Sequence, residues 1–104
     1  MSSDVKHSIA VLILKGDEIL AVCRPDNDDE LPGIWGLPAG TCRDSETAED
    51  VIARIGHDKL GAKLVPVRRR VAGTQTRSRY RLEMELWEAA MEGIPTYPVW
   101  QWAQ

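Results

Sequence analysis

The sequence lacks the features of membrane and secreted proteins. No run approaches the roughly 18 apolar residues that span a bilayer, and the first residues do not form a basic segment followed by a long apolar one. Only two cysteines are present, Cys23 and Cys42, which is too few for a disulfide framework, so reduced thiols are expected. These absences predict a cytoplasmic protein with no membrane partner.

A strongly basic balance is also missing. The net charge of −3 excludes a general nucleic-acid coat, and neither an internal repeat nor a low-complexity tract is present. The chain has 104 residues, of which 43% are hydrophobic and 28% charged, a composition too apolar for a disordered protein. A chain of this length can bury one core, so we expect a single domain over residues 1–104.

The positive charge is concentrated in one segment of the second half. Between Arg68 and Arg81 the chain has six arginines and no acidic residue. Guanidinium groups bind phosphates through two parallel hydrogen bonds, so this segment is a candidate phosphate site. The alternative is the solvated face of a hairpin. The arginines are Arg68, Arg69, Arg70, Arg77, Arg79 and Arg81.

In the first half, apolar spacing predicts a hairpin followed by a helix. Residues 8–14 form a continuous apolar run rich in β-branched residues and residues 18–24 a second strand, with a turn between them. Residues 45–60 have helical spacing, with Asp44 or Ser45 as the N-cap and Gly61 as the end. Gly56 lies inside this helix and suggests close packing there.

In the second half the pattern predicts strands. Residues 62–71 are expected to form one strand and residues 73–76 a loop. From Arg79 to Leu86 the sequence alternates, which predicts a strand with one apolar face and one polar face. The apolar face would carry Tyr80, Leu82, Met84 and Leu86. Strands around one central helix make an α+β domain.

The stretch from Gly33 to Gly61 resembles the signature of the Nudix hydrolase family. Gly40, Glu46, Arg54 and Gly61 stand at the spacing of that signature, after a lead-in from Trp35 to Gly40. The resemblance implies the Nudix fold, an α/β/α sandwich-like arrangement with a mixed sheet and a loop–helix. It also implies hydrolysis of a pyrophosphate bond with Mg²⁺ or Mn²⁺ as cofactor. The chain is shorter at its C-terminus than the resemblance would suggest.

Three positions depart from the family pattern. In the family, three glutamates on the helix hold the metal, whereas this chain has Ile55, Asp58 and Lys59 there. Asp58 keeps a carboxylate with a shorter reach, and Lys59 places a cation at a ligand position, where it could neutralise phosphate instead. Mg²⁺ is commonly bound through one or two carboxylates plus phosphates and water, so Asp58 remains a candidate ligand.

Several other residues are candidates for the same site. Glu46 is expected in the first helical turn as a cap. Arg54 is expected to pair with Glu46 or with a nearby backbone carbonyl, or with Asp50 on the surface, and His57 is expected to be a solvated side chain. The candidate catalytic residues are Asp58, Glu46 and Arg54; the candidate metal ligands are Asp58, Glu83 and Glu85, with Glu88 as a further acid. The candidate substrate-binding residues are Arg68, Arg70, Arg79, Arg81 and Lys59. The stacking candidates are Tyr80, Trp87 and Trp100, whereas Trp35 is expected in the core.

Two functional hypotheses follow. The first is a Nudix-type hydrolase that cleaves a nucleoside triphosphate or a nucleoside diphosphate derivative. The second is a Nudix-fold module with impaired catalysis that binds a nucleotide or a partner protein, which the residues Ile55 and Lys59 favour. A missing C-terminal helix would expose an apolar sheet face, and a homodimer is one way to cover it.

Overall fold

A mixed β-sheet forms the body of the computed structural model, which describes residues 4–23, 35–43, 45–76, 78–96 and 100–103. The helical segment lies between the fourth and fifth strands in the chain order. The strands are β1 (Asp4–Lys15), β2 (Glu18–Cys23), β3 (Trp35–Gly36), β4 (Ala39–Thr41), β5 (Lys63–Thr76), β6 (Tyr80–Glu92) and β7 (Trp100–Ala103). The helical segment consists of α1 (Ala48–Ile55) and η1 (Gly56–Leu60).

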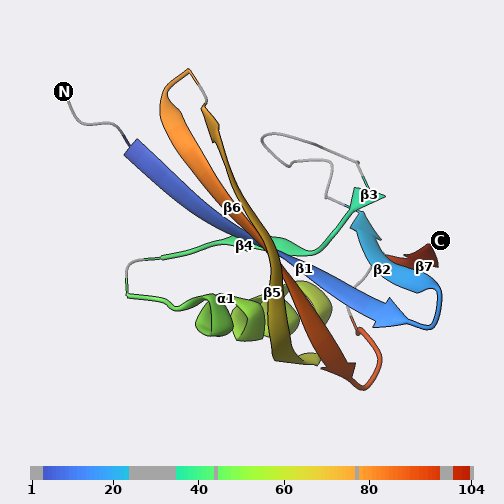
Figure 1. The fold of residues 1–104 in the computed structure, drawn as a ribbon. Helices are drawn as coiled ribbons and strands as arrows, with labels where there is room; N and C mark the ends of the chain where they lie inside the picture. The colour runs from blue at the N-terminus through green and yellow to red at the C-terminus, as the bar shows by residue number, and fades with distance from the viewer. Residues whose placement is uncertain (1–3, 24–34, 44, 77, 97–99, 104) are drawn as a thin grey trace.

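The strand order explains why the sheet is mixed. The strands follow the order β3-β2-β1-β6-β5, while β4 pairs with β1 and β7 with β2 (Figure 1). β1 and β6 run parallel, and the other pairs are antiparallel. The parallel pair joins segments far apart in sequence, with Ile13 opposite Ala89. The predicted α+β class and mixed sheet are therefore confirmed.

The predicted hairpin of the first half is present. β1 and β2 pair through Leu14 and Ile19, and Gly16 takes a positive φ of 59° at the turn. Ile9 and Val11 are fully buried and Ile13 is 1% exposed. Because side chains alternate along a strand, these three point toward one face of the sheet. That face carries the core, and α1 packs against it.

The helix begins later than the sequence predicted. Its N-cap is Thr47 rather than Asp44 or Ser45; Asp44 lies outside the described residues. The Thr47 hydroxyl accepts a hydrogen bond from the Asp50 N–H, and the Asp50 carboxylate accepts one from the Thr47 N–H, both at 3.1 Å. This reciprocal capping box satisfies two N–H groups at the helix start, which explains why Thr47 outcompetes its neighbours.

The helix end follows the prediction. At Gly56 the α-helix continues as the π-helix η1, and Gly61 ends it in the left-handed conformation with φ of 66°. A Cβ on Gly56 would lie 2.5 Å from the carbonyl oxygen of Ala62 and 2.9 Å from Cγ of Leu64. The close packing suggested by Gly56 is therefore present.

The long β5–β6 hairpin corrects two expectations. The predicted loop at residues 73–76 is strand, since Gly73 pairs with Met84 and Thr76 with Arg81. The predicted apolar face of β6 is also not the buried one: Met84 is 37% exposed, whereas Ala89 is 3% exposed in the core. The parallel register with β1 decides this, because it places Ala89 beside the buried Ile13.

One face of the sheet is covered by helix. α1 and η1 lie across the face that carries the core, and the described part of the chain contains no second helical layer (Figure 1). The sandwich-like arrangement is thus present on this side only. Trp35, expected in the core, is 42% exposed on β3. Among the described residues, no helix is long and apolar enough to cross a membrane.

Candidate functional site

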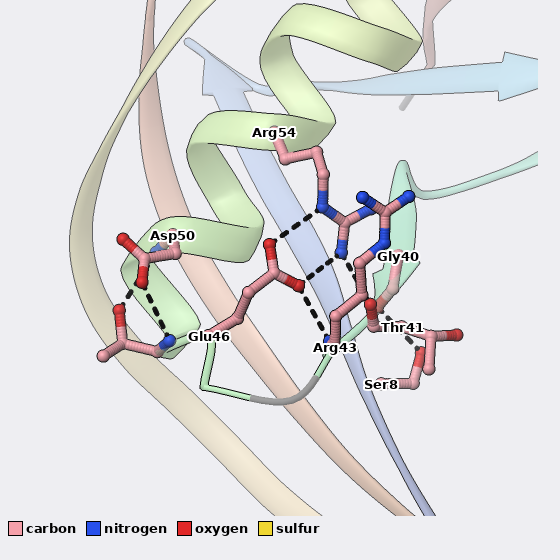
Figure 2. A network of polar contacts seen from close by, with 8 residues as sticks. Ser8, Gly40, Thr41, Arg43, Glu46, Asp50 and Arg54 are labelled. Carbon is pink, nitrogen blue, oxygen red and sulfur yellow. Dashed lines mark hydrogen bonds and ion pairs between the residues drawn. The ribbon is translucent and has the colours of Figure 1, made fainter.

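A bidentate ion pair holds the loop after β4 against α1. The Arg54 Nε donates to Glu46 Oε2 at 3.0 Å, and its Nη2 donates to Glu46 Oε1 at 2.9 Å (Figure 2). The same Nη2 donates to the carbonyl oxygen of Thr41 at 2.6 Å. Two parallel charge-assisted bonds fix both distance and orientation. Arg54 therefore binds both predicted partners, Glu46 and a nearby backbone carbonyl, and ties the helix to the last residue of β4.

The Glu46 carboxylate also binds the backbone of the loop that precedes it. Its Oε1 also accepts a hydrogen bond from the backbone N–H of Arg43 at 2.8 Å. The side-chain hydrogen bond from Arg54, followed by the backbone bond from Arg43, lowers the pKa of Glu46 to about 2. The hydrogen bond from Glu46 in turn raises the pKa of Arg54. Both groups are charged at neutral pH, and the pair is a structural lock.

Two expectations about this lock were wrong. Glu46 does not lie in the first helical turn, because it precedes the Thr47 N-cap. Asp50 does not pair with Arg54, because its carboxylate accepts from the Thr47 N–H within the capping box. The Arg54 guanidinium donates to Glu46 and to the Thr41 carbonyl oxygen instead.

Gly40 lets β4 approach the helix directly. A Cβ at Gly40 would lie 3.1 Å from Cγ1 of Ile55 and 3.6 Å from Cγ1 of Val51. Ile55 is 1% exposed, so its side chain fills the space beneath β4 as part of the core. The residue at the first family metal position therefore packs inward and presents no polar group to solvent.

Asp58 is the carboxylate that the helical segment keeps. It lies in η1, its side chain is 48% exposed, and its Oδ1 lies 2.8 Å from Nδ1 of the neighbouring His57. The hydrogen bond from His57 lowers the pKa of Asp58, and the positive charges of Arg54 and Arg43 lower it further. His57 is 89% exposed, as expected of a solvated side chain. Lys59 is exposed on the same segment.

Glu85 is a second acid, placed by β6 on the helix-covered face. It is 15% exposed, and its Oε2 lies 2.5 Å from His7 Nε2. Trp87 Nε1 donates to Glu85 Oε1 at 2.9 Å, and Arg69 Nη1 lies 3.8 Å from the same oxygen. Burial raises the pKa of Glu85, but the hydrogen bonds from Trp87 and His7 outweigh it, so the net pKa is lowered. Glu85 is thus an ionised carboxylate held by three strands.

Cys42 links this acid to the loop. Its N–H donates to the carbonyl oxygen of His7 at 2.7 Å. Burial raises the pKa of the Cys42 thiol, and the negative charges of Glu46 and Glu85 raise it further. His7 therefore contacts both Glu85, through its ring, and the loop, through its carbonyl oxygen, which places Glu85 beside the loop–helix. Sequence reasoning missed His7 here, because its partner Glu85 is 78 residues away in the chain.

The other predicted acid, Glu83, lies opposite His7 on β1 and shares one face of β6 with Glu85. Glu83 lies 3.3 Å from Arg81 and is 41% exposed. Arg79 is exposed just before β6. Arg77 lies outside the described residues.

Arg68 and Arg70 lie on the other side of the sheet. Both bind Glu88, at 3.4 Å and 2.7 Å. Glu88 is opposite Leu12, which alternates with the core residues of β1, so this group points away from α1. The hydrogen bond from Arg70 lowers the pKa of Glu88. The structure therefore does not bring Arg68, Arg70 or Glu88 to the loop–helix.

A resident divalent ion does not fit the helical segment. Within the described ranges, no group of three or more His, Cys, Asp or Glu residues is arranged to hold a metal. Ile55 is buried in the core, and Lys59 brings a positive charge beside Asp58. One carboxylate suits an ion that arrives already bound to substrate phosphates, whereas an ion held by the protein alone needs more oxygen ligands. Asp58, Glu83 and Glu85 are not assembled into one ligand set.

Solved structures resemble this one over nearly its whole length. A MutT protein from Methanosarcina mazei Go1 superposes with a TM-score of 0.84 at 17% identity, covering 100% of this chain and 80% of that one. A MutT NUDIX hydrolase from Burkholderia pseudomallei gives 0.82 at 19% identity, covering 96% and 83%. An ADP-ribose pyrophosphatase from Streptococcus suis 89-1591 gives 0.68 at 17% identity, covering 95% and 73%.

The likeness is one of structure rather than of sequence. No family model matches the sequence, and no curated protein matches it. The superpositions nevertheless include the mixed sheet and the loop–helix that Gly40, Glu46 and Arg54 build. The chain has the fold of the Nudix hydrolases.

Proposed function

We propose that this chain is a Nudix-type hydrolase that cleaves the pyrophosphate bond of a nucleoside triphosphate or a nucleoside diphosphate derivative. The observation that carries the proposal is the intact lock between Glu46, Arg54 and Thr41, which holds the loop–helix in place. A loop fixed in this way supports the positioning of phosphates, because catalysis depends on holding the reacting groups in one geometry. The neighbouring structures named as a NUDIX hydrolase and an ADP-ribose pyrophosphatase support the same reaction class.

Different charged residues around the loop–helix would bind phosphate, activate water and position the loop. Lys59 is exposed and would bind phosphate as a point charge. Asp58 would accept a hydrogen bond from the attacking water or bind the Mg²⁺ or Mn²⁺ that enters with the nucleotide. Glu85 would contribute a second carboxylate from the sheet. Arg54 acts as a positioning residue, because Glu46 and Thr41 occupy its donors.

A screen for phosphate and pyrophosphate release tests this proposal. It covers nucleoside triphosphates, dinucleotides and nucleotide sugars, each with magnesium, with manganese and with chelator. Asp58→Asn is expected to abolish the turnover while the fold is kept. Glu92→Gln is the matched control, because Glu92 is a 61% exposed acid that pairs with Lys63 at 3.8 Å at the end of β6. Turnover that is unchanged in Asp58→Asn would remove Asp58 from the reaction.

A second candidate function is supported by a specific observation. Ile55 is buried under Gly40 and Lys59 replaces an acid, so the chain offers one helix carboxylate where the family pattern has three. We therefore also propose a nucleotide-binding module that has lost hydrolysis. Binding of the nucleotide in the presence of chelator, without release of any product from the panel, would establish this function and exclude the first.

The cysteine content and the proposed substrate class bear on where in the cell the protein acts. We propose a cytoplasmic location, since two cysteines and a substrate of the nucleotide class suit a reducing compartment. Fractionation of cells expressing the tagged chain tests it, and recovery in a secreted or membrane fraction would contradict it.

A further inference from the structure

The charges of the loop–helix suit an anion better than a metal ion. Ile55, at the first family metal position, is buried in the core, and Lys59 places a cation at the third. Asp58 keeps the one carboxylate of these three positions. A divalent ion is held by oxygen ligands, and a positive side chain at a ligand position repels it. The three positions therefore favour a different occupant.

Pairing within the site leaves positive charge in excess. The Glu46 carboxylate and the Arg54 guanidinium form a bidentate ion pair, so their charges offset each other. The charges that remain beside the carboxylate of Asp58 are those of Arg43 and Lys59, which are both exposed. Within the part of the chain that the structure describes, neither of these two side chains has a hydrogen bond or an ion pair. Two unpaired cations thus lie beside one carboxylate.

Arg43 is positioned by the backbone of the loop. Its N–H donates to Glu46 Oε1 at 2.8 Å, which fixes the residue where the loop approaches α1. Figure 2 shows its side chain extending from the loop toward α1, where the Arg54 guanidinium lies. The hydrogen bond from His57 is the main cause of the lowered pKa of Asp58, and the charges of Arg54 and Arg43 lower that pKa further. The Arg43 charge therefore acts on the helical segment as well as on the loop.

A diphosphate group is the anion that matches two cations from different elements. Arg43 lies in the loop after β4 and Lys59 in η1, so each can contact a different phosphate. An arginine binds a phosphate through two parallel hydrogen bonds, whereas a lysine acts as a point charge. A single phosphate would leave one of the two cations unused. The nucleotides of the proposed function carry such a diphosphate group.

We propose that Arg43 and Lys59 hold the diphosphate group of the ligand directly, with no metal ion between the protein and the phosphates. The inference rests on the proposed function in taking the loop–helix as the nucleotide site, and it applies to the hydrolase and to the binding module alike. A metal ion that enters with a substrate is then not needed for the ligand to bind. Asp58 repels the diphosphate when no such ion is present.

Calorimetric titration with methylenediphosphonate, a diphosphate analogue with a non-hydrolysable bridge, tests this site in chelator and in magnesium. Binding is expected in chelator, and Arg43→Gln and Lys59→Gln should each weaken it about tenfold. Asp58→Asn should bind at least as tightly in chelator, because the substitution removes a charge that repels phosphate. Lys63→Gln is the matched control, because Lys63 is a 74% exposed lysine that pairs with Glu92 at the start of β5.

Circular dichroism verifies that each variant is folded. Binding that requires magnesium would overturn the proposal, and so would losses in Arg43→Gln and Lys59→Gln no larger than the loss in Lys63→Gln. Loss of binding in chelator on Asp58→Asn would also contradict it. These outcomes are separate from those of the hydrolase. Turnover without binding in chelator would keep the hydrolase and exclude the metal-free site, and binding in chelator without turnover would do the reverse.

Discussion

At the scale of single residues, the lock between Glu46 and Arg54 organises the loop. Three donors converge on the Glu46 carboxylate: Arg54 Nε, Arg54 Nη2 and the Arg43 N–H. Its members Glu46 and Arg54 were predictable from the sequence, because they stand at the spacing of the family signature. A backbone carbonyl was also expected beside Arg54, but which backbone groups take part, the Thr41 carbonyl and the Arg43 N–H, depends on how the loop folds against α1.

The lowered pKa of Glu46 makes stability depend on pH. The pKa falls from 4.5 to about 2 on folding, so the lock stabilises the protein fully above pH 4.5 and its contribution is lost as the pH falls toward 2. We expect urea unfolding to show this loss in the native chain and a flatter profile in Glu46→Gln. The exposed Glu49→Gln variant is the control. Parallel profiles for the native chain and Glu46→Gln would contradict this role.

The two departures in the helix are expected to respond differently to restoration of glutamate. Ile55 is 1% exposed, so Ile55→Glu would bury a carboxylate without a partner and cost about 3 kcal/mol or more of unfolding free energy. Lys59 is exposed, so Lys59→Glu should change stability by less than ~0.5 kcal/mol. It should also strengthen Mn²⁺ binding beside Asp58.

Chemical denaturation and calorimetric titration with Mn²⁺ measure the two effects. An Ile55→Glu variant as stable as the native chain would mean that this side chain reaches solvent. Unchanged Mn²⁺ affinity in Lys59→Glu would mean that Asp58 does not face a metal position.

At the scale of elements, the helix shows which of its boundaries a sequence pattern predicts and which it does not. The helix and its end at Gly61 were predictable from spacing and from a glycine stop. The start was misplaced because the capping box of Thr47 and Asp50 competes with several earlier polar residues. The buried face of β6 was misassigned because its pairing with β1 is non-local, and alternation alone does not say which face meets the core.

Gly56 is expected to tolerate no side chain. An alanine Cβ would lie 2.5 Å from the Ala62 carbonyl oxygen, a backbone atom that cannot rotate away. Overpacking of this kind costs about 1–3 kcal/mol, which exceeds the ~1 kcal/mol that alanine gains over glycine in a helix. Gly56→Ala should therefore lower the melting temperature.

Gly73→Ala is the matched control, because nothing lies within 4 Å of its Cβ position on β5. Differential scanning calorimetry compares the two variants. A Gly56→Ala protein that melts above the native chain would show that the turn after η1 can move aside.

At the scale of the whole molecule, the two faces of the sheet differ in what they carry. One carries the core, the helix and the loop locked by Glu46 and Arg54, and the other carries exposed apolar side chains around the ion pairs of Glu88. The fold was predictable from the signature and the hairpin. The positions of Arg68 and Arg70 were not, because two irregularities in β5 decide on which side of the sheet its arginines emerge.

The most direct test of the account is where a nucleotide binds. Amide chemical shifts of the ¹⁵N-labelled chain are measured during titration with ADP-ribose and with a nucleoside triphosphate, each with magnesium and with chelator. The account predicts shifts concentrated at residues 40–43 and 58–61, and little change at Val71 or Met84 on the face of the sheet opposite α1. Shifts confined to the face opposite α1, or none at all in a folded protein, would contradict the assignment of the loop–helix as the site.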